Sequence, residues 1–233
     1  MKDGVAIITG AGRGIGRATA ETLAGRGYRL VLVSRNEAEL REAAAKVKTA
    51  TLVAPADVTD QAALRRVVDQ ALQEFGRIDA IVNNAGYAPS RKIEEMTADE
   101  WRATIDTNLS ATFFLSQAVW PTFRKQNGGV IVNISSAAAR DPFEGLSLYG
   151  AAKAGINLLT LGWAREGQAI GVRVHAIAPA AVETGMFRSL VTPEQYPTEK
   201  TLSPADVAKV VAGCITGELA HTNGEVIWLH KTL

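Results

Sequence analysis

A tyrosine and a lysine four positions apart, Tyr149 and Lys153, are the residues of this sequence most able to do acid–base chemistry. They lie in the run SLYGAAKAGINLL at residues 147–159, whose small residues predict a closely packed helix. Residues four apart on a helix share one face, so the phenol and the ammonium group would point together. A positioned phenol can donate or accept a proton, and a nearby cation favours its ionised form. The same spacing is common on amphipathic surface helices, so other residues must support a catalytic interpretation.

A glycine-rich turn follows the first predicted strand, in VAIITGAGRGIGRATAETLAGRG at residues 5–27. Its glycines would let the backbone turn sharply, approach a pyrophosphate and pack against the strand. The helix that follows offers free N–H groups to a phosphate. The spacing is T-G-x-x-x-G-x-G rather than G-x-G-x-x-G, but its place directly after a strand favours a dinucleotide site over a simple tight loop. The four glycines are Gly10, Gly12, Gly14 and Gly16.

The end of the second predicted strand bears on which dinucleotide would bind. An acidic residue there would bind the ribose 2′-hydroxyl of NAD, whereas an arginine accommodates the 2′-phosphate of NADP. The sequence reads LVLVSRNEAEL, with Ser34 and Arg35 and no carboxylate before Glu37. Arg13 in the glycine loop could reach the same phosphate, because guanidinium forks match phosphate oxygens. Two solvated surface arginines are the alternative, but their joint position favours NADP over NAD.

Seven short apolar runs alternate with stretches of helical period and are predicted to be strands. They span residues 5–9, 30–34, 51–54, 80–83, 130–134, 172–178 and 225–229. Most are apolar throughout, which is typical of strands covered on both faces of a parallel sheet. Capping patterns at residues 97–100, 192–195 and 203–206 predict helix starts. The alternation predicts an α/β fold with a doubly wound, mostly parallel seven-stranded sheet, in one domain over residues 1–233.

Six motifs, in order and at family spacing, make the chain similar to the short-chain dehydrogenase/reductase family over nearly its whole length. They are TGAGRGIG at 9–16, DV at 57–58, NNAG at 83–86, TNLSA at 107–111, IVNISS at 131–136 and YGAAK at 149–153. Any one of them could arise by chance, but all six together could hardly do so. The resemblance implies a Rossmann fold and an oxidoreductase that binds a nicotinamide cofactor.

The resemblance implies four catalytic residues, Asn108, Ser136, Tyr149 and Lys153. Tyr149 would act as the general acid toward a substrate carbonyl, whose oxygen Ser136 would hold. Lys153 would bond the nicotinamide ribose and lower the pKa of the phenol from its usual value of ~10. Asn108 would hold a water that links Lys153 to solvent. The family places its serine thirteen residues before its tyrosine, which selects Ser136 and leaves Ser135 with a structural role.

The implied cofactor contacts come from the glycine loop, three strand ends and the segment HAIAPAAVETGM at residues 175–186. That last segment departs from the family, since His175 stands where Asn is common and Ala180 where Gly is common. We expect His175 to be a hydrogen-bonded structural residue, and Ala180 to be costly if its φ must be positive. The implied contacts are Gly10, Gly12, Arg13, Gly14, Ile15, Gly16, Ser34, Arg35, Asp57, Val58, Asn84, Ala85, Gly86, Pro179, Val182 and Thr184.

The segment from about 186 to 203 corresponds to the substrate lid of the family. It is short here, which suggests an open pocket. Candidate pocket walls, which could equally be core residues, are Tyr87, Phe143, Leu146 and Phe187. No charged residue is clearly placed to recognise a substrate carboxylate or phosphate. We therefore expect a small apolar or aromatic carbonyl compound.

The composition is that of a globular protein, with 47% hydrophobic and 21% charged residues. A net charge of +1 argues against nucleic acid and membrane surfaces as partners, and no apolar run approaches the ~18 residues of a membrane span. The single cysteine, Cys214, excludes an intrachain disulfide, and three scattered histidines predict no metal site. No signal peptide is recognised, so a cytoplasmic location is expected.

A homodimer or homotetramer is expected from the resemblance. The helices around 101–125 and 149–168 could form the interface, with Trp120 and Trp163 as candidate contacts or, equally, core residues. The C-terminal sequence GEVIWLHKTL lacks the usual family ending, which often helps to build a tetramer.

These features predict an NADP-dependent oxidoreductase that reduces a ketone or aldehyde. One alternative is the same chemistry on an acyl thioester, as in 3-oxoacyl-carrier-protein reductases, for which Arg124 and Lys125 could attract an acidic carrier. Cations at a helix C-terminus are also simply stabilising. The other alternative is a non-catalytic NADP-binding sensor or scaffold.

Overall fold

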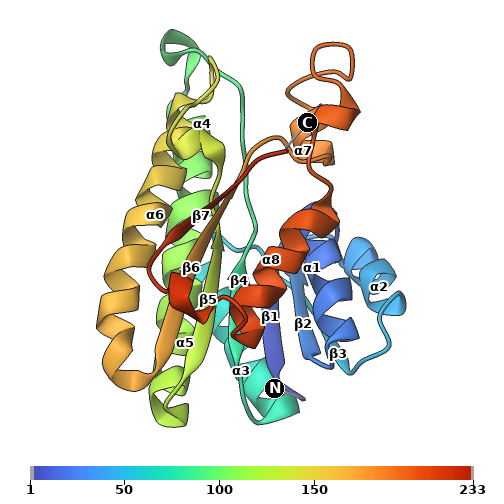
Figure 1. Ribbon diagram of the computed structural model, residues 1–233, viewed down its shortest axis with the longest axis vertical. Coiled ribbons are helices and arrows are strands. Elements are labelled where there is room, and N and C mark those ends of the chain that lie inside the picture. The colour runs from blue at the N-terminus through green and yellow to red at the C-terminus, as the bar shows by residue number, and fades with distance from the viewer. Residues whose placement is uncertain (1–2, 232–233) are drawn as a thin grey trace.

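A seven-stranded parallel sheet forms the centre of the computed structural model, which describes residues 3–231. The strand order is β3-β2-β1-β4-β5-β6-β7, so the chain winds outward from β1 in one direction and then from β4 in the other (Figure 1). The strands are β1 (Val5–Thr9), β2 (Arg29–Ser34), β3 (Thr51–Pro55), β4 (Ala80–Asn83), β5 (Gly129–Ile134), β6 (Val172–Pro179) and β7 (Val226–Leu229). The predicted doubly wound sheet is confirmed. The ends of the predicted range 1–233, residues 1–2 and 232–233, lie outside the described residues.

Helices cover both faces of the sheet. α1, α2 and α8 close one core, which holds Ile8, Leu32 and Val211, whereas α3, α5 and α6 close the other, which holds Ile7 and Val33. The strands are therefore apolar on both sides, as their sequences indicated. The helices are α1 (Gly14–Gly25), α2 (Glu37–Ala45), α3 (Gln61–Phe75), α4 (Ala98–Ile105), α5 (Ala111–Gln126), α6 (Ser147–Gly167), α7 (Gly185–Arg188) and α8 (Pro204–Thr216). Within residues 3–231, none of these helices has the length and apolar character needed to span a membrane.

Two of the three predicted helix starts are confirmed. Thr97 and Ser203 each accept a hydrogen bond from the backbone N–H three residues on, and close capping boxes with Glu100 and Asp206. The prediction at residues 192–195 is wrong, because the segment forms only a turn there. Thr192 and Gln195 do exchange the capping hydrogen bonds. However, Pro197 follows too soon, and a proline disfavours helical backbone at the residue before it.

The topology fixes where a ligand can bind. In a doubly wound sheet the crevice lies outside the carboxyl ends of the strands, at the point where the strand order reverses. Here that point is between β1 and β4, which pair in register from Ala6 with Ala80 to Ile8 with Val82. The glycine turn follows β1 at this same edge, and β5 and β6 end beside it.

Candidate active site

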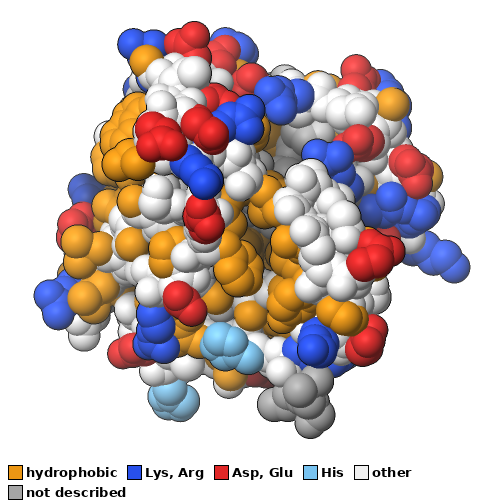
Figure 2. Space-filling model, turned by 90° about the horizontal axis from the view of Figure 1, so that it is seen from above, with side chains coloured by type: hydrophobic (Ala, Val, Ile, Leu, Met, Phe, Trp, Pro, Cys, Tyr) orange, Lys and Arg blue, Asp and Glu red, His pale blue; other side chains and the backbone are white. Residues whose placement is uncertain are grey.

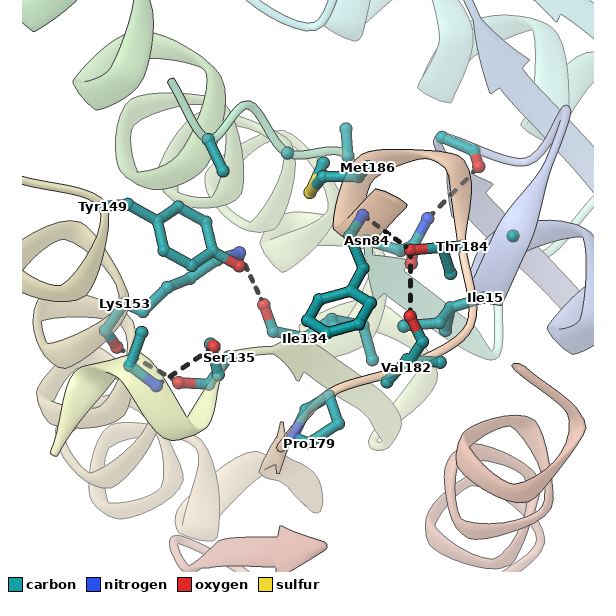
Figure 3. Close-up of a pocket in the computed structure, with 18 of the residues that line it drawn as sticks. Ile15, Asn84, Ile134, Ser135, Tyr149, Lys153, Pro179, Val182, Thr184 and Met186 are labelled. Carbon is teal, nitrogen blue, oxygen red and sulfur yellow. Dashed lines mark hydrogen bonds between the residues drawn. The ribbon is translucent and has the colours of Figure 1, made fainter. Parts of the chain in front are cut away.

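A cleft of about 770 Å³ opens at this edge of the sheet. Figure 2 looks down on it as a hollow between two halves of the molecule, bordered by apolar and charged side chains. Figure 3 shows Asn84, Thr184 and Ile15 on one side of the cleft and Tyr149 and Lys153 on the other. The cleft therefore has a half lined by the glycine loop and a half lined by the Tyr149–Lys153 pair.

The glycine loop is shaped by close backbone contacts. Gly10 and Gly14 have φ values of +63° and +54°, a region that favours glycine. The Asn84 side chain donates to the Thr9 carbonyl at 2.8 Å and to the Gly10 carbonyl at 3.2 Å, which ties the loop to β4. A Cβ on Gly16 would lie 2.2 Å from the Gly10 carbonyl oxygen. Gly16 thus lets α1 approach the loop, and it does not itself line the cleft.

The other residues predicted to hold the cofactor line the cleft together. They come from five separate segments, and the structure brings them to one continuous surface. They are Gly10, Gly12, Arg13, Gly14, Ile15, Ser34, Arg35, Asp57, Val58, Asn84, Ala85, Gly86, Pro179, Val182 and Thr184. The backbone at Gly86 passes close to Asn108, whose Oδ1 would lie 3.1 Å from an added Cβ. The loop, the helix N-terminus of α1 and the open cleft fit a dinucleotide.

Two exposed arginines border the half of the cleft formed by the glycine loop, where a 2′-phosphate was predicted. Arg13 and Arg35 both line it, and Arg35 lies 4.0 Å from Asp57 in a solvent-exposed ion pair. Sequence reasoning missed a carboxylate here: Glu39 of α2 also lines the cleft and packs against Gly12, whose added Cβ would lie 2.8 Å from the Glu39 Cβ. This position therefore carries two positive charges opposed by two nearby negative ones.

The Tyr149–Lys153 pair lies on one face of α6, as predicted. Lys153 is buried, its Nζ lies 5.5 Å from the centroid of the Tyr149 ring, and it donates a 2.8 Å hydrogen bond to the Ile134 carbonyl at the end of β5. Ser136 lies two residues after the end of β5, and its hydroxyl is close enough to that of Tyr149 to influence the pKa of the phenol. Ser135 is buried and donates to the Lys153 carbonyl, which fits its predicted structural role.

Burial shifts the two titrating groups in opposite directions. It raises the pKa of the Tyr149 phenol to about 12, and the Ser136 hydroxyl opposes this rise only in part. It lowers the pKa of Lys153 to about 7. Loss of solvent therefore raises the pKa of Tyr149 here, and the role of Lys153 in lowering it with an oxidised nicotinamide stays a prediction. Burial thus favours the neutral form of both groups.

Asn108 lies in a π-helical turn, η2 (Asp106–Ser110), that joins α4 to α5. Its buried side chain donates to the Tyr87 carbonyl at 2.7 Å and to the Thr104 carbonyl at 2.8 Å. These bonds fix the loop after β4, next to Gly86, from behind the cleft. A single π turn inside an α-helix often marks a functional site. The motif TNLSA predicted the residue but gave no sign of the π turn.

The two departures near β6 have local explanations. His175 is fully buried, and its Nδ1 lies 3.0 Å from both the carbonyl and the hydroxyl of Thr222. Its place in the strand, away from the cleft lining, fits the structural role predicted for it. Ala180 does not have a positive φ, and its N–H donates to the Leu229 carbonyl at 2.9 Å. Alanine is therefore not strained at this position.

The remaining half of the cleft has a mixed lining. Phe143, Leu146 and Phe187 line it as predicted, but Tyr87 does not. Arg140 also lies in the cleft, stacked on Trp228, and the sequence alone did not place this charge there. Trp163 of the dimer candidates is buried in the core of its own chain, and Trp120 packs partly against that core.

The lid segment is held by one arginine. Arg188 forms an ion pair with Glu183 at 2.6 Å and donates to the Tyr196 carbonyl at 2.8 Å. The Phe187 and Tyr196 rings meet edge to face at 5.4 Å. Leu190, Val191 and Tyr196 from this segment line the cleft. No three metal-ligating side chains gather anywhere in the described part of the chain.

The sequence and the fold both match known oxidoreductases. The family described as short chain dehydrogenase matches residues 4–195. An uncharacterized oxidoreductase of Staphylococcus aureus is 35% identical over 218 residues, which cover 93% of this chain and 92% of that one. A second, from Staphylococcus epidermidis, is 34% identical over 223 residues, covering 96% and 95%.

Solved structures of two reductases superpose closely on this chain. The 3-ketoacyl-(acyl-carrier-protein) reductase from Brucella melitensis, complexed with NADH, has a TM-score of 0.93 at 27% identity and covers 98% of this chain and 97% of its own. Levodione reductase has a TM-score of 0.92 at 30% identity, covering 99% and 97%.

Proposed function

This chain belongs to the short-chain dehydrogenase family of oxidoreductases, and from that premise we propose that it interconverts a carbonyl group and an alcohol with NADP(H). The observation that carries the proposal is the shared cleft: Ser136, Tyr149 and Lys153 line one half, and the glycine loop lines the other. A cofactor held on the loop would extend toward the three polar side chains. When bound, the nicotinamide supplies the hydride for reduction.

Tyr149 acts as the general acid of this reaction. Because burial holds its pKa at about 12, the phenol keeps its proton at neutral pH until negative charge builds on the substrate oxygen. Ser136, next to the phenol, donates a hydrogen bond to the same oxygen. Lys153 of α6, which is anchored to the Ile134 carbonyl at the end of β5, holds the cofactor ribose. Asn108 keeps the loop after β4 in place.

Replacing Tyr149 with phenylalanine tests this assignment. The Tyr149→Phe variant removes only the hydroxyl, so the fold and the cofactor half of the cleft should be unaffected. General acid catalysis contributes about a hundredfold to ten-thousandfold, and we expect carbonyl reduction to fall within that range while the affinity for NADPH is unchanged. Undiminished turnover would contradict the role of the phenol. Absence of turnover in both proteins with a wide range of carbonyl compounds would favour the sensor or scaffold alternative.

Arg13 and Arg35 form the proposed clamp for a 2′-phosphate, in which guanidinium forks meet phosphate oxygens. Asp57 and Glu39 oppose it, so the preference for NADPH should be moderate. Titration of tryptophan fluorescence with NADPH and NADH tests the clamp, with at least about tenfold tighter NADPH binding expected. Arg35→Met should reduce the ratio of NADPH to NADH affinity. Arg41 is an exposed arginine of α2 that is paired with Glu37, and Arg41→Met should leave the ratio unchanged. Equal affinities in the unaltered protein would contradict the clamp.

We further propose a cytoplasmic homo-oligomer. Phe113 of α5 and Leu158 and Leu161 of α6 are exposed at 37%, 71% and 37%, and two such apolar helix faces fit a dimer contact better than open solvent. A Leu158→Glu variant should shift the mass measured by light scattering toward that of the monomer. An unchanged mass would place the contact elsewhere.

Reduction of a 3-oxoacyl thioester is the second candidate. It is favoured by the structural similarity to 3-ketoacyl-(acyl-carrier-protein) reductase and by Arg124 and Lys125 in the last turn of α5. Reduction rates measured on acetoacetyl thioesters with and without an acidic carrier protein distinguish this candidate from the reduction of a small carbonyl compound. A carrier-dependent rise in kcat/KM that Arg124→Glu abolishes would favour the thioester function.

A further inference from the structure

A guanidinium–indole stack lies on the Tyr149 side of the cleft, apart from the residues assigned to the cofactor. The Cζ of Arg140 lies 4.4 Å from the centroid of the Trp228 ring, and both residues line the same cleft as Ser136 and Tyr149. Arg140 ends a short 3-10 helix that Ser136 caps, whereas Trp228 lies in β7, paired with β6. The stack is therefore fixed on one side by the sheet and on the other by the turn that carries Ser136.

The stack leaves the hydrogen-bonding edge of Arg140 free for a ligand. A guanidinium that lies on an aromatic ring uses its face in the contact, and its N–H groups point outward in the plane. Arg188 in the lid segment is neutralised by Glu183. Arg140, by contrast, has no ion-pair partner within 4.0 Å among residues 3–231. Its charge is thus oriented by the indole and has no ion-pair partner among the described residues, in the same cleft as the proposed acid.

The surroundings of Arg140 favour a single negative charge on the ligand. Arg140 is exposed, but Phe143, Leu146 and Phe187 line the same cleft, and a ligand that covers the guanidinium there would strengthen the ion pair by excluding water. A guanidinium fork matches the two oxygens of a carboxylate. Asp141 lines the cleft next to Arg140 and would repel a phosphate dianion more strongly than a carboxylate.

The geometry points to a carbonyl substrate that also carries a carboxylate, which accepts hydrogen bonds from Arg140 while its carbonyl oxygen lies at Ser136 and Tyr149. The inference rests on the proposed carbonyl–alcohol function and names its substrate class. Arg140 is then a specificity residue, and Trp228 is the platform that orients it. A keto or hydroxy acid replaces the uncharged compound expected from the sequence.

A pair of probes that differ only in charge tests the inference. Para-acetylbenzoate and para-acetylbenzamide have nearly the same shape and the same reacting carbonyl, and NADPH oxidation follows their reduction. A hydrogen bond to a charged group is worth about tenfold or more in binding, so kcat/KM for the acid should exceed that for the amide by about this factor. Arg140→Met should abolish the preference through a higher KM for the acid, with the amide unaffected.

Further variants serve as controls. Arg102→Met alters an exposed arginine of α4 that is paired with Asp99, and it should leave the reduction of both probes unchanged. Trp228→Leu should weaken the preference for the acid without reversing it, because Arg140 keeps its charge but loses its platform. Para-acetylphenyl phosphate is the third probe, and a preference for it over the acid that depends on Arg140 would overturn the choice of carboxylate.

The outcomes separate this inference from the proposed function. Equal reduction of acid and amide, or a preference that survives in Arg140→Met, would refute the role of Arg140 and leave the oxidoreductase proposal intact. If neither probe is reduced, their affinities are compared through tryptophan fluorescence, to which Trp228 against Arg140 contributes, and Trp228→Leu identifies its share of the signal. Tighter binding of the acid that Arg140→Met abolishes would then support the carboxylate site and contradict only the proposed reduction of the carbonyl. Equal affinities for the acid and the amide would refute the carboxylate site.

Discussion

Replacing His175 with asparagine should make the stability of the protein less sensitive to acid. Burial lowers the pKa of this histidine from its usual 6.5 to about 4, the Arg173 charge acts in the same direction, and the Thr222 carbonyl opposes both. The folded chain therefore keeps His175 neutral while the unfolded chain takes up a proton. The stability that the neutral ring contributes is complete above the unfolded pKa and is lost as the pH falls from about 6.5 toward 4.

The size of this effect follows from the shift. Each pKa unit corresponds to about 1.4 kcal/mol. Integrated from neutral pH down to about pH 5, the extra proton bound by the unfolded state costs the folded protein about 2 kcal/mol. The side chain is fully buried, so screening by solvent does not reduce the figure. An asparagine amide can reach Thr222 as Nδ1 does and does not titrate, and most of the pH dependence should disappear with it.

Urea unfolding at a series of pH values measures the effect. The free energy of unfolding of the unaltered protein should fall with acid by about 2 kcal/mol more than that of His175→Asn. All other titrating groups are common to both proteins and cancel in the difference. His221→Asn, which removes an exposed histidine, should follow the unaltered protein. Parallel curves for the unaltered protein and His175→Asn would refute the idea that His175 is held neutral.

Three further outcomes are expected. Gly16→Ala should lower the free energy of unfolding by about 2 kcal/mol and weaken NADPH binding, because the new Cβ would meet the Gly10 carbonyl. Gly25 lies on the same helix with open space around it. Gly25→Ala should therefore leave the free energy of unfolding, measured with urea, unchanged or raise it by about 0.5 kcal/mol. The affinity for NADPH should fall as the pH rises through about 7 and Lys153 loses its charge, and Lys153→Met should show no such step. Arg188→Met should free the lid segment, seen as faster proteolysis between residues 190 and 200 at unchanged global stability; equal cleavage would show that Arg188 does not hold it.

The fold could be predicted because each strand carries its own signal. A run such as VAIIT in β1 is buried on both faces, and its short length and β-branched residues favour a strand inside a covered sheet over a buried helix. The segment 192–195 shows the limit of local signals. Its capping bonds form, but a helix also needs residues to continue into, and Pro197 prevents this.

Much of the site could be located from motifs, because short stretches of chain place Gly10, Ser136 and Tyr149 at strand ends and helix starts. The stack of Arg140 on Trp228 could not, since it joins two distant stretches that only the pairing of β6 and β7 brings together. The raised pKa of Tyr149 could not be predicted from the motifs either. Its neighbour in sequence, Lys153, predicts a lower value, and the loss of solvent that raises it depends on how the whole chain packs.

The departures from the family pattern near β6 and β7 have local structural explanations. Ala180 has an unstrained backbone, and its N–H pairs with Leu229 of β7. The altered C-terminal stretch forms that strand and brings Trp228 into the cleft. Arg140, which lines the same cleft as Tyr149, stacks on this indole. Each of these changes is thus either absorbed locally or contributes to the lining of the cleft, and none of them removes a residue of the proposed catalytic set.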